Sequence, residues 1–345
     1  MPSRSKGLTV AILGCGKIGQ AVLQGLLAAA LQAPTTTNDS ATNPHPLVDS
    51  IQVTVRSDAA VERVSHATRP FLAGAGIGFP GVEICKGDRN RAIALRADIV
   101  LIGCKHTALA ELLADLQGGR GDLCRSHGRD NDQMIVPGSS PRVLVSLVGG
   151  VSAETIARQM NGQDNGDQGW LVTRAVCSVA AAVRESVTVL SDTEAWTTHS
   201  AARGLVTALF EQVGIVRWLP ERQMHAASAL GSSSVAFFAG IIAALAEGLG
   251  AEGDDETENE DDAATLPLQV ALEITAQAAR GAATLIHHQR APQEIVAQVS
   301  TKGGATEAGS AVLESKRVME GLRECTVVTA KATAGLGATS SQGRG

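Results

Sequence analysis

Three glycines between two apolar runs, close to the start of the chain, are the first residues that could position a ligand. They follow the spacing G-x-G-x-x-G in the stretch VAILGCGKIGQAVLQGLL. At a turn from a strand into a helix, such glycines allow a tight bend and let a diphosphate approach the backbone, where the helix N-terminus attracts it. We therefore predict that a dinucleotide binds here, through Gly14, Gly16, Lys17, Ile18 and Gly19. A glycine-rich turn without a ligand is the alternative.

A second signal follows the next apolar run, where dinucleotide-binding folds that select NAD place an acidic residue for the ribose 2′-hydroxyl. This chain has Arg56 and Ser57 at that place, in VTVRSDAA. A guanidinium there would bind a 2′-phosphate through charge-assisted hydrogen bonds of about 1.5–3 kcal/mol each, which selects NADPH over NADH. Asp58 comes next, but it suits the N-cap of the following helix better. A surface arginine in a turn is the other interpretation of Arg56.

The elements that would hold these residues alternate in type along the first 220 positions. Helical spacing predicts helices after the glycine turn and at residues 89–96 and 107–116. Alternation of strands and helices indicates an α/β fold with a Rossmann-type, doubly wound parallel sheet. Polar stretches at 32–50 and 117–142 are predicted to be loop insertions. Apolar clusters predict the strands, at residues 8–13, 51–55, 82–85, 99–103, 143–148, 171–175 and 187–190.

From about residue 220 onward the strand signals stop and alanine-rich helical patterns replace them. An apolar stripe along residues 270–285 is broad enough to be buried against partner helices, including those of another subunit. We therefore predict a dinucleotide-binding domain over residues 1–220 and an all-helical dimerisation and substrate domain over 221–330. Residues 331–345 are predicted to be a disordered tail.

Charge and composition narrow the set of partners. The net charge of −6, without a basic stripe, argues against nucleic acid. Residues 252–262 contain eight carboxylates in eleven positions, and because they have no apolar anchor we expect a solvated loop rather than a metal site. The six cysteines show no C-x-x-C spacing, which predicts neither zinc nor disulfides and favours a reducing cytoplasm. The longest wholly apolar run, residues 235–246, is too short to span a bilayer, so we expect no membrane association.

Several motifs, in the same order, resemble those of the pyrroline-5-carboxylate reductase family. GCGKIGQAVLQGL is similar to the family's opening glycine loop, and AVRESVTVL resembles its VREGxTV run. ADIVLIGCKH is similar to its fourth strand, keeping Lys105 but having His106 in place of a proline. The most specific element is VSTKGGATEAGSAVLES, residues 299–315, which resembles VSSPGGATIxxLxVLE. The likeness runs from residue 8 to about residue 324, and the chain is identified as a diverged, fungal-like member.

The resemblance implies hydride transfer from NAD(P)H to the C=N bond of 1-pyrroline-5-carboxylate, giving L-proline. Arg56 and Ser57 favour NADPH over NADH as the donor. The substrate is a small cyclic imine with one carboxylate, which the N-terminus of a helix starting near KGGAT would attract. If the imine enters protonated, no strong acid is needed and catalysis is mostly positioning. The implied substrate-binding residues are Ser233, Ser300, Lys302, Gly303, Gly304 and Thr306. A plain turn between helices is the alternative for the two glycines.

The same resemblance implies further roles on the cofactor side. Asn90 would lie beside the adenosine portion, and Lys105 would line the cofactor cleft unless it is a surface lysine. RAVCSVAA, residues 174–181, matches the family's nicotinamide-side loop and keeps its arginine as Arg174, and Ser178 is implied to contact the cofactor. The catalytic residues implied are Ser233, Thr306 and Lys105. The family's site forms where one subunit meets helices of its partner, which implies a homodimer or a larger assembly.

The chain departs from the family pattern at the chemical end. Ser178 and Val179 replace Asn-Thr after Cys177, residues 232–235 replace Gly-Ser-Gly-Pro, and Lys302 replaces a proline. Two alternatives stay open beside the standard reaction: a reductase of a substituted pyrroline carboxylate or other cyclic imine, and an NADPH-binding homologue without turnover. Lys302 would hold a second acid group in the first alternative, or simply face solvent.

Overall fold

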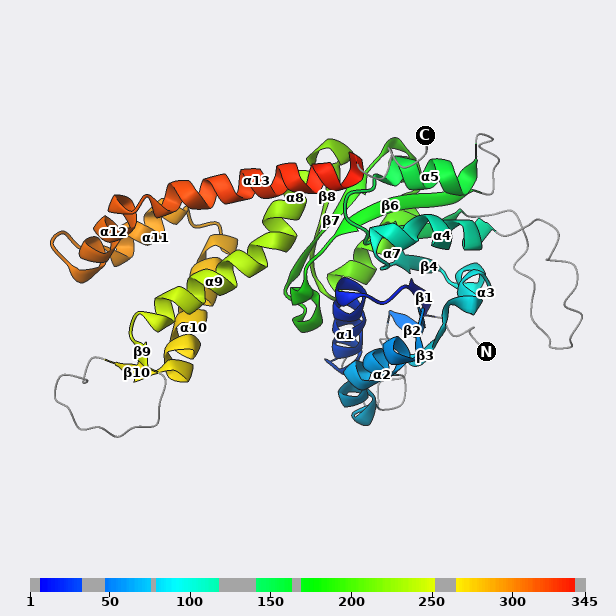
Figure 1. Cartoon of the computed structure of the whole chain (residues 1–345), viewed down its shortest axis with the longest axis horizontal. Coiled ribbons are helices and arrows are strands. Elements are labelled where there is room, and N and C mark those ends of the chain that lie inside the picture. Colours follow the sequence, from blue (N-terminus) through cyan, green and yellow to red (C-terminus); the bar gives the residue numbers. More distant parts are fainter. Residues whose placement is uncertain are drawn as a thin grey trace, which may run out of the picture. The chain divides into compact units, whose positions relative to one another are not determined.

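The computed structural model describes residues 7–32, 47–75, 79–117, 141–162, 169–251 and 265–338 (Figure 1). The chain forms two compact units. Unit 1 contains Met1–Ser232 together with Thr329–Gly345, and unit 2 contains Ser233–Val328. The boundary lies beyond the predicted residue 220 because the first helix after the sheet still packs on its strands β6 and β7. The chain leaves unit 1 and returns to it before its end.

Eight strands form the sheet of unit 1, in the order β3-β2-β1-β4-β5-β6-β7-β8. The predicted strands are all present. Neighbours pair in parallel, except that β6 and β7 are antiparallel, so β7 and β8 run against the other six. The strands are β1 (Leu8–Leu13), β2 (Val48–Val55), β3 (Gly81–Lys86), β4 (Ile99–Ile102), β5 (Arg142–Ser146), β6 (Trp170–Val176), β7 (Ser186–Asp192) and β8 (Gly214–Pro220).

Helices cover both faces of this sheet, which is why its central strands are continuous apolar runs. In β1, Val10 and Ile12 join one core cluster, whereas Ala11 and Leu13 join the other. The first cluster is completed by α1, α2 and α7, and the second by α3, α4 and α5. The helices of this unit are α1 (Lys17–Gln32), α2 (Asp58–Ala73), α3 (Asn90–Arg96), α4 (His106–Gln117), α5 (Ala153–Asn161), α6 (Glu194–Thr198), α7 (Ser200–Glu211) and α8 (Met224–Ser228).

Two details of the predicted sheet are corrected. The sheet is mixed rather than wholly parallel, because the connection between β6 and β7, residues 177–185, contains only the short turn η3 (Val179–Val183). A parallel neighbour needs a crossover of roughly a dozen residues or more, which does not fit there. In addition, β2 begins at Val48, inside the predicted loop insertion 32–50, and pairs with Leu8 from its first residue.

Unit 2 is built from helices, as predicted, with one small addition. A two-stranded parallel ladder joins β9 (Gly250–Ala251) to β10 (Leu266–Pro267), and α9 packs on α10. The ladder connects the two ends of the acidic segment, which itself lies outside the described residues. The helices are α9 (Ser234–Glu247), α10 (Leu268–His287), α11 (Pro292–Val299), α12 (Ala305–Ser315) and the first part of α13 (Val318–Ala338).

The end of the chain differs from the predicted disordered tail. Helix α13 continues to Ala338, and residues from Thr329 onward belong to unit 1. Alanine and threonine alternate through this part without a helix breaker until the glycines near its end, so helical propensity is sufficient to carry it. The remainder of the tail and most of the insertion 117–142 lie outside the described residues.

Helix α8, the turn η5 (Ala229–Ser233) and α9 follow each other without a break, and η5 has π-helical geometry. The continuous segment Glu221–Glu247 is the one helix of the described residues long and apolar enough to cross a membrane, with a mean hydropathy of 1.9 over an 18-residue window. It is longer than the apolar run seen in the sequence because the helix also includes the serines and glycine before that run and the charged residues at its ends. π-helical turns of this kind are frequent at functional sites.

Candidate active site

Two cavities of unit 1 bear on the candidate site. The larger of these has a volume of about 810 Å³ and lies at the carboxyl ends of β1, β2, β3 and β4. Ligands bind at this edge of open α/β sheets, because the loops after parallel strands gather there. The predicted cofactor residues that line it are Gly14, Gly16, Arg56, Ser57, Asn90 and Lys105. Six of the predicted residues are thus gathered on one cavity.

The glycine turn is shaped as the sequence predicts. Gly14 has a φ of 77°, and a Cβ on it would lie 2.7 Å from the Cβ of Cys104. Gly16 donates its N–H to the Gly103 carbonyl at 3.2 Å, and a Cβ there would approach that oxygen to 3.1 Å. Helix α1 starts at Lys17, so its first N–H groups have no acceptor within the helix, and the first helical hydrogen bond runs from the Gln20 N–H to the Gly16 carbonyl at 2.9 Å. By contrast, a Cβ on Gly19 would make ordinary contacts.

The end of β2 carries positive charge. Arg56 follows the strand directly, and the Ser57 hydroxyl accepts a hydrogen bond from the Ala60 N–H at 3.3 Å. Ser57 is therefore the N-cap of α2, and the predicted role of Asp58 as N-cap is wrong. Asp58 stands in the first helical turn, where its carboxylate pairs with Lys86 at 2.7 Å. A carboxylate at that place is favoured by the helix dipole as well as by the lysine.

Asn90 also lines the larger cavity, and its side chain connects two elements of the fold. Its Oδ1 accepts a hydrogen bond from the Thr54 hydroxyl at 2.5 Å, and its Nδ2 donates to Asp115 at 2.9 Å. The first bond reaches β2 and the second reaches α4, so the Asn90 amide links these two elements beside the cavity. Lys105 extends from the loop between β4 and α4, and His106 begins α4.

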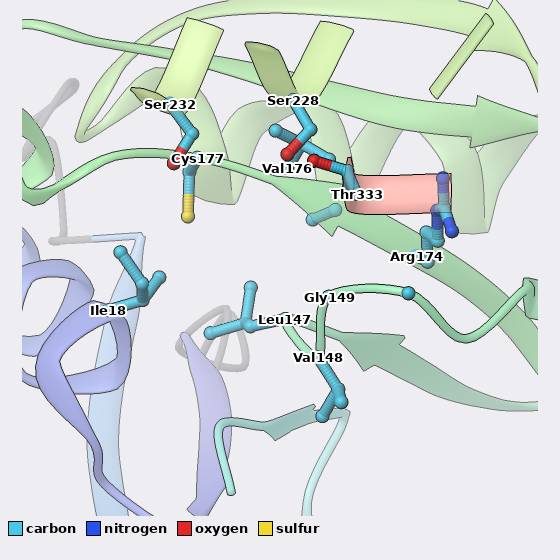
Figure 2. Close-up of a pocket in the computed structure, with 12 residues that line it drawn as sticks. Ile18, Leu147, Val148, Gly149, Arg174, Val176, Cys177, Ser228, Ser232 and Thr333 are labelled. Atoms are coloured by element: carbon cyan, nitrogen blue, oxygen red, sulfur yellow. The ribbon is translucent and has the colours of Figure 1, made fainter. Parts of the chain in front are cut away.

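The smaller cavity has a volume of about 180 Å³ and lies beyond the ends of β5 and β6 (Figure 2). Ser228 and Ser232 point toward it from the helical segment that follows the sheet, and Thr333 from α13. Leu147 and Ile18 form an apolar side. Ile18 therefore lies on the smaller cavity, and Lys17 lines neither.

Arg174 is the one charged residue on the wall of the smaller cavity, and its side chain is only 4% exposed. Its Nε lies 3.3 Å from the Glu221 carboxylate without hydrogen-bond alignment, and its Nη1 donates to the Val151 carbonyl at 3.4 Å. Burial lowers the pKa of Arg174, and Glu221 partly offsets this. Burial, followed by the charge of Arg174, also lowers the pKa of the neighbouring His225. The guanidinium is thus a buried cation with unused donor capacity beside the cavity.

The residues between Arg174 and β7 are held by serines. Ser178 is buried; its N–H donates to the Ser186 hydroxyl at 3.0 Å, and its own hydroxyl caps η3 through the Ala180 N–H. This predicted cofactor residue lines neither cavity, whereas its neighbour Cys177 lines the smaller one. Burial raises the pKa of the Cys177 thiol to about 12, so the thiol is neutral at physiological pH.

The predicted substrate residues lie in unit 2, mostly at the turn between α11 and α12. Gly304 is the N-cap of α12, and a Cβ on it would lie 2.5 Å from the Thr301 hydroxyl. The N–H of Gly303 donates to the carboxylate of Glu307, so this donor at the start of α12 is already used by an anionic side chain of the same helix. Lys302 and Thr306 are exposed. Ser233 ends the π-helical turn and precedes α9.

Several wall residues were not identified from the sequence. Ser228 and Ser232 stand four positions apart on a helical segment, a spacing that could have revealed them. Arg174 was recognised as kept from the family but given no role. Arg63 lines the larger cavity from α2, and Thr333 lines the smaller one from a segment predicted to be disordered. No pattern in the sequence points to Thr333.

The larger cavity fits a dinucleotide. Its volume is within the roughly 300–1,000 Å³ usual for cofactor sites. Gly14 and Gly16 form a cradle that any Cβ would fill, and Arg56 and Lys86 supply cations where phosphate groups would lie. No group of three or more His, Cys, Asp or Glu side chains among the described residues could hold a metal ion.

The fold and these cavities define a dinucleotide-binding α/β protein with an appended helical unit. Residues 9–123 match the family described as NADP oxidoreductase, coenzyme F420-dependent. Residues 221–336 match the family described as pyrroline-5-carboxylate reductase dimerisation. The first match lies within the α/β part of the chain, and the second covers the helices that follow it.

Relatives that match nearly the whole chain place it more narrowly. It is 44% identical to a pyrroline-5-carboxylate reductase of Penicillium fellutanum, over 95% of this chain and 90% of that one. It is 31% identical to a pyrroline-5-carboxylate reductase of Neurospora crassa, over 94% of this chain and 92% of that one. The chain belongs to the pyrroline-5-carboxylate reductase family.

Solved structures agree on the fold. A pyrroline-5-carboxylate reductase from Coxiella burnetii superposes with a TM-score of 0.65 at 20% identity, covering 96% of this chain and 99% of that one. A Plasmodium falciparum pyrroline carboxylate reductase with NADP bound gives a TM-score of 0.64 at 14% identity, covering 96% and 98%. The predicted fold class, a Rossmann-type sheet followed by a helical domain, is confirmed.

Proposed function

We propose that this protein reduces the C=N bond of 1-pyrroline-5-carboxylate to give L-proline, with NADPH as the preferred cofactor. The observation that carries the proposal is the large cavity at the ends of β1, β2 and β4, which combines the glycine cradle with Arg56 and Ser57. Family membership over nearly the whole chain supplies the reaction, because the relatives named above carry that activity in their names.

The cofactor would be held at three places by residues of unit 1. The start of α1, at Lys17, would attract the diphosphate, and Arg56 with Ser57 would bind the 2′-phosphate. Asn90 would border the adenosine portion, since it bridges β2 and α4 along the cavity wall. NADPH, when bound, supplies the hydride that reduces the imine carbon.

The smaller cavity would receive the reacting groups. Its volume of about 180 Å³ admits one small ring and little water, and Ile18 and Leu147 give that ring an apolar surface. Arg174, Ser228 and Thr333 present hydrogen-bond donors that would orient a carbonyl oxygen of the reacting groups. These residues position the reactants and exclude water, which is the main contribution that a protonated imine requires. Proton donation by Lys105, Ser233 or Thr306 stays a prediction.

The carboxylate of the substrate would bind at the start of α12 in unit 2. The donors there are the backbone near Gly304 and the hydroxyls of Ser300 and Thr306, with Lys302 adding a cation. Glu307 already accepts a hydrogen bond from Gly303, so the substrate would use the remaining donors. A bound acid at this place would also stabilise the N-terminus of the helix.

Unit 2 would pair with a second copy of the chain as a homodimer. Its apolar side chains are exposed in the single chain, among them Phe238, Ile274 and Val296 at 63%, 56% and 60%. The match to a dimerisation family covers the apolar segment Glu221–Glu247, which supports a protein interface for it rather than a lipid one. We also propose a cytoplasmic location, without membrane or nucleic acid partners, because five cysteines among the described residues are free thiols and no basic stripe is present in the sequence.

A different cyclic imine is the second candidate substrate. The smaller cavity contains Cys177 and Ser232 at positions where the sequence departs from the family pattern, and Lys302 replaces the family's proline. An added cation beside the substrate carboxylate would suit a substrate with a second acid group. This candidate keeps the same cofactor and the same hydride chemistry.

The experiment that tests the proposal is NADPH oxidation by the purified protein with 1-pyrroline-5-carboxylate, with L-proline identified as the product. We expect turnover with NADPH above that with NADH. Turnover only with substituted pyrroline carboxylates would favour the second candidate. Tight NADPH binding without turnover of any imine would contradict both. Rescue of a proline auxotroph by the gene is an independent check in cells, and light scattering would give the oligomeric state.

A further inference from the structure

A stripe of residues along α2 faces the larger cavity and includes an arginine that the sequence did not single out. Ser57, Ala60 and Arg63 all line the cavity, and they are spaced three positions apart from the N-cap into the second turn of α2. Residues three apart lie on one face of a helix, one above the other. Arg63 is therefore directed at the same space as Ser57, although it stands further along the helix.

The direction of helical side chains lets Arg63 reach back to the start of α2. Side chains in an α-helix incline toward its N-terminus, and a long one covers the turn before its own Cα. The residue in that turn is Ala60, whose methyl group leaves the path of the Arg63 side chain open. A larger residue at position 60 would obstruct this path.

Arg63 is also free to take a ligand. It is exposed and has no salt bridge or hydrogen bond within the described part of the chain, whereas Lys86 on the same cavity is paired with Asp58 at 2.7 Å. Burial raises the pKa of the Cys15 thiol in the glycine turn to about 12, and the charge of Arg63 partly offsets that rise. Burial likewise raises the pKa of Cys104 to about 11, and there the offsetting side-chain charge is that of Arg56. Both guanidinium groups therefore act on thiols that line this cavity.

We propose that Arg63 and Arg56 together bind one phosphate monoester, the 2′-phosphate of NADPH, so that Arg63 is a second determinant of cofactor choice. The inference rests on the proposed function for the identity of the nucleotide. A monoester dianion carries more charge than one guanidinium neutralises, and three oxygens can accept hydrogen bonds from two forks and the Ser57 hydroxyl. The diphosphate, in contrast, is served by the start of α1.

The test is equilibrium binding of NADPH and NADH to the full-length protein, measured by nucleotide fluorescence and calorimetry. Arg63→Gln should weaken NADPH binding about tenfold, as expected for loss of one exposed charge-assisted contact, and change NADH binding by less than about twofold. Arg69→Gln is the matched control, because Arg69 stands on the same helix but does not line the cavity. It should leave both affinities unchanged.

Two further measurements keep the inference open to contradiction. Adenosine 2′-monophosphate should compete with NADPH less well against Arg63→Gln than against the unaltered protein, while adenosine 5′-monophosphate competes equally against both. In a cycle with Arg56→Gln, the two losses should be coupled rather than additive, since both side chains contact one group. Arg63→Lys should keep part of the preference for NADPH.

An equal loss of NADPH and NADH binding in Arg63→Gln would move Arg63 to the diphosphate and overturn the inference. An unchanged preference for NADPH would overturn it as well, while leaving the proposed reaction intact. Conversely, a protein that prefers NADPH through Arg63 but reduces no pyrroline carboxylate would support this inference and contradict the proposed function. Circular dichroism of each variant shows whether a loss of binding comes from unfolding.

Discussion

The two cavities of unit 1 are built in different ways. The larger one is lined by short stretches that follow consecutive strands, from Gly14 to Asp115, and its shape depends on backbone at Gly14 and Gly16. The smaller one is lined by residues as far apart in sequence as Ile18 and Thr333, and its shape depends on side chains. Local sequence therefore determines the shape of the larger cavity, whereas tertiary packing determines the shape of the smaller one.

The charged residues of the two cavities also differ, in how far they are exposed to solvent. Arg56 and Arg63 at the larger cavity are exposed cations, which bind an anion at little desolvation cost. Arg174 at the smaller cavity is a buried cation that depends on Glu221. A change at the first cavity should alter affinity, and a change at the second should alter both stability and turnover. The predictions below test this distinction, beginning with the largest expected effect.

Gly14→Val should abolish function through the larger cavity. A valine at a φ of 77° costs on the order of 1–3 kcal/mol, and its Cβ would collide with Cys104, so the turn must move. We expect NADPH affinity to fall by about 100-fold or more, measured by fluorescence titration. Gly19→Ala is the control, because a Cβ there makes ordinary contacts and should be tolerated. Equal losses for the two variants would contradict the assigned geometry.

Arg174→Met should act through the smaller cavity. Removing the guanidinium leaves Glu221 without its partner, and because that carboxylate is 31% exposed we expect a loss near the lower end of the range for buried pairs, about 3 kcal/mol. The free energy of unfolding from urea titration measures this loss. Turnover should fall more than NADPH affinity does. If the variant loses NADPH binding and keeps its turnover number, the two cavities do not divide their tasks as described.

Arg56→Glu should change cofactor choice. The reversed charge repels a 2′-phosphate, so NADPH binding should weaken by about tenfold or more while NADH binding changes by less than about threefold. Dissociation constants for both nucleotides check this. Lys86→Gln offers a comparison on the same cavity, since Lys86 is already paired with Asp58 and should contribute less. Equal weakening of NADPH and NADH in Arg56→Glu would remove the 2′-phosphate assignment.

Lys302→Ala should have a smaller effect, on the substrate alone. The side chain is exposed, so solvent screens its charge and the KM for 1-pyrroline-5-carboxylate should rise about threefold, with NADPH affinity unchanged. A substrate with a second carboxylate should lose more. Lys316→Ala, at the opposite end of α12, is the control. Gly304 is a poor position for this test, because any side chain there would first collide with Thr301. An unchanged KM for every substrate would place the acid-binding site elsewhere.

The cysteine thiols of both cavities should not react with an alkylating reagent, and this is the smallest of the expected effects. Burial raises the pKa of Cys15 and Cys177 to about 12 and that of Cys104 to about 11. At pH 8 roughly one thiol in a thousand or fewer is then ionised, and the thiolate is the reactive form. Iodoacetamide at pH 8 should leave these three unlabelled in mass spectra of the native protein and label them after unfolding. Their native pKa values lie above the unfolded ones, so stability is full below about pH 9 and falls as the pH rises further.

The sheet and the shape of the glycine turn were predictable because their signals are local. Residues 10–13 form an unbroken apolar run, as expected of a strand covered on both faces, and the glycine spacing requires only the turn after it. The antiparallel direction of β7 cannot be read from the hydrophobicity of its residues. The short connection over residues 177–185 was the available clue, since it cannot hold a parallel crossover.

The smaller cavity could be predicted only in part. Arg174 stood out as a retained residue, but its burial and its pairing with Glu221 depend on how β6 meets the segment after β8. Ser57 was predicted to bind a phosphate, and it is also the N-cap of α2. Asp58 was predicted to be the N-cap but stands one position later, in the first helical turn. Hydrogen bonds of this kind are decided by φ and ψ at single residues, which composition does not encode.

The return of α13 to unit 1 bears on how the protein can be handled. Thr333 stands within thirteen residues of the last position, yet it belongs to the wall of the smaller cavity. A truncation before Thr333 would therefore remove part of the wall of the smaller cavity rather than trim a dispensable end. Excising unit 2 would require two cuts and a new join between Ser232 and Thr329.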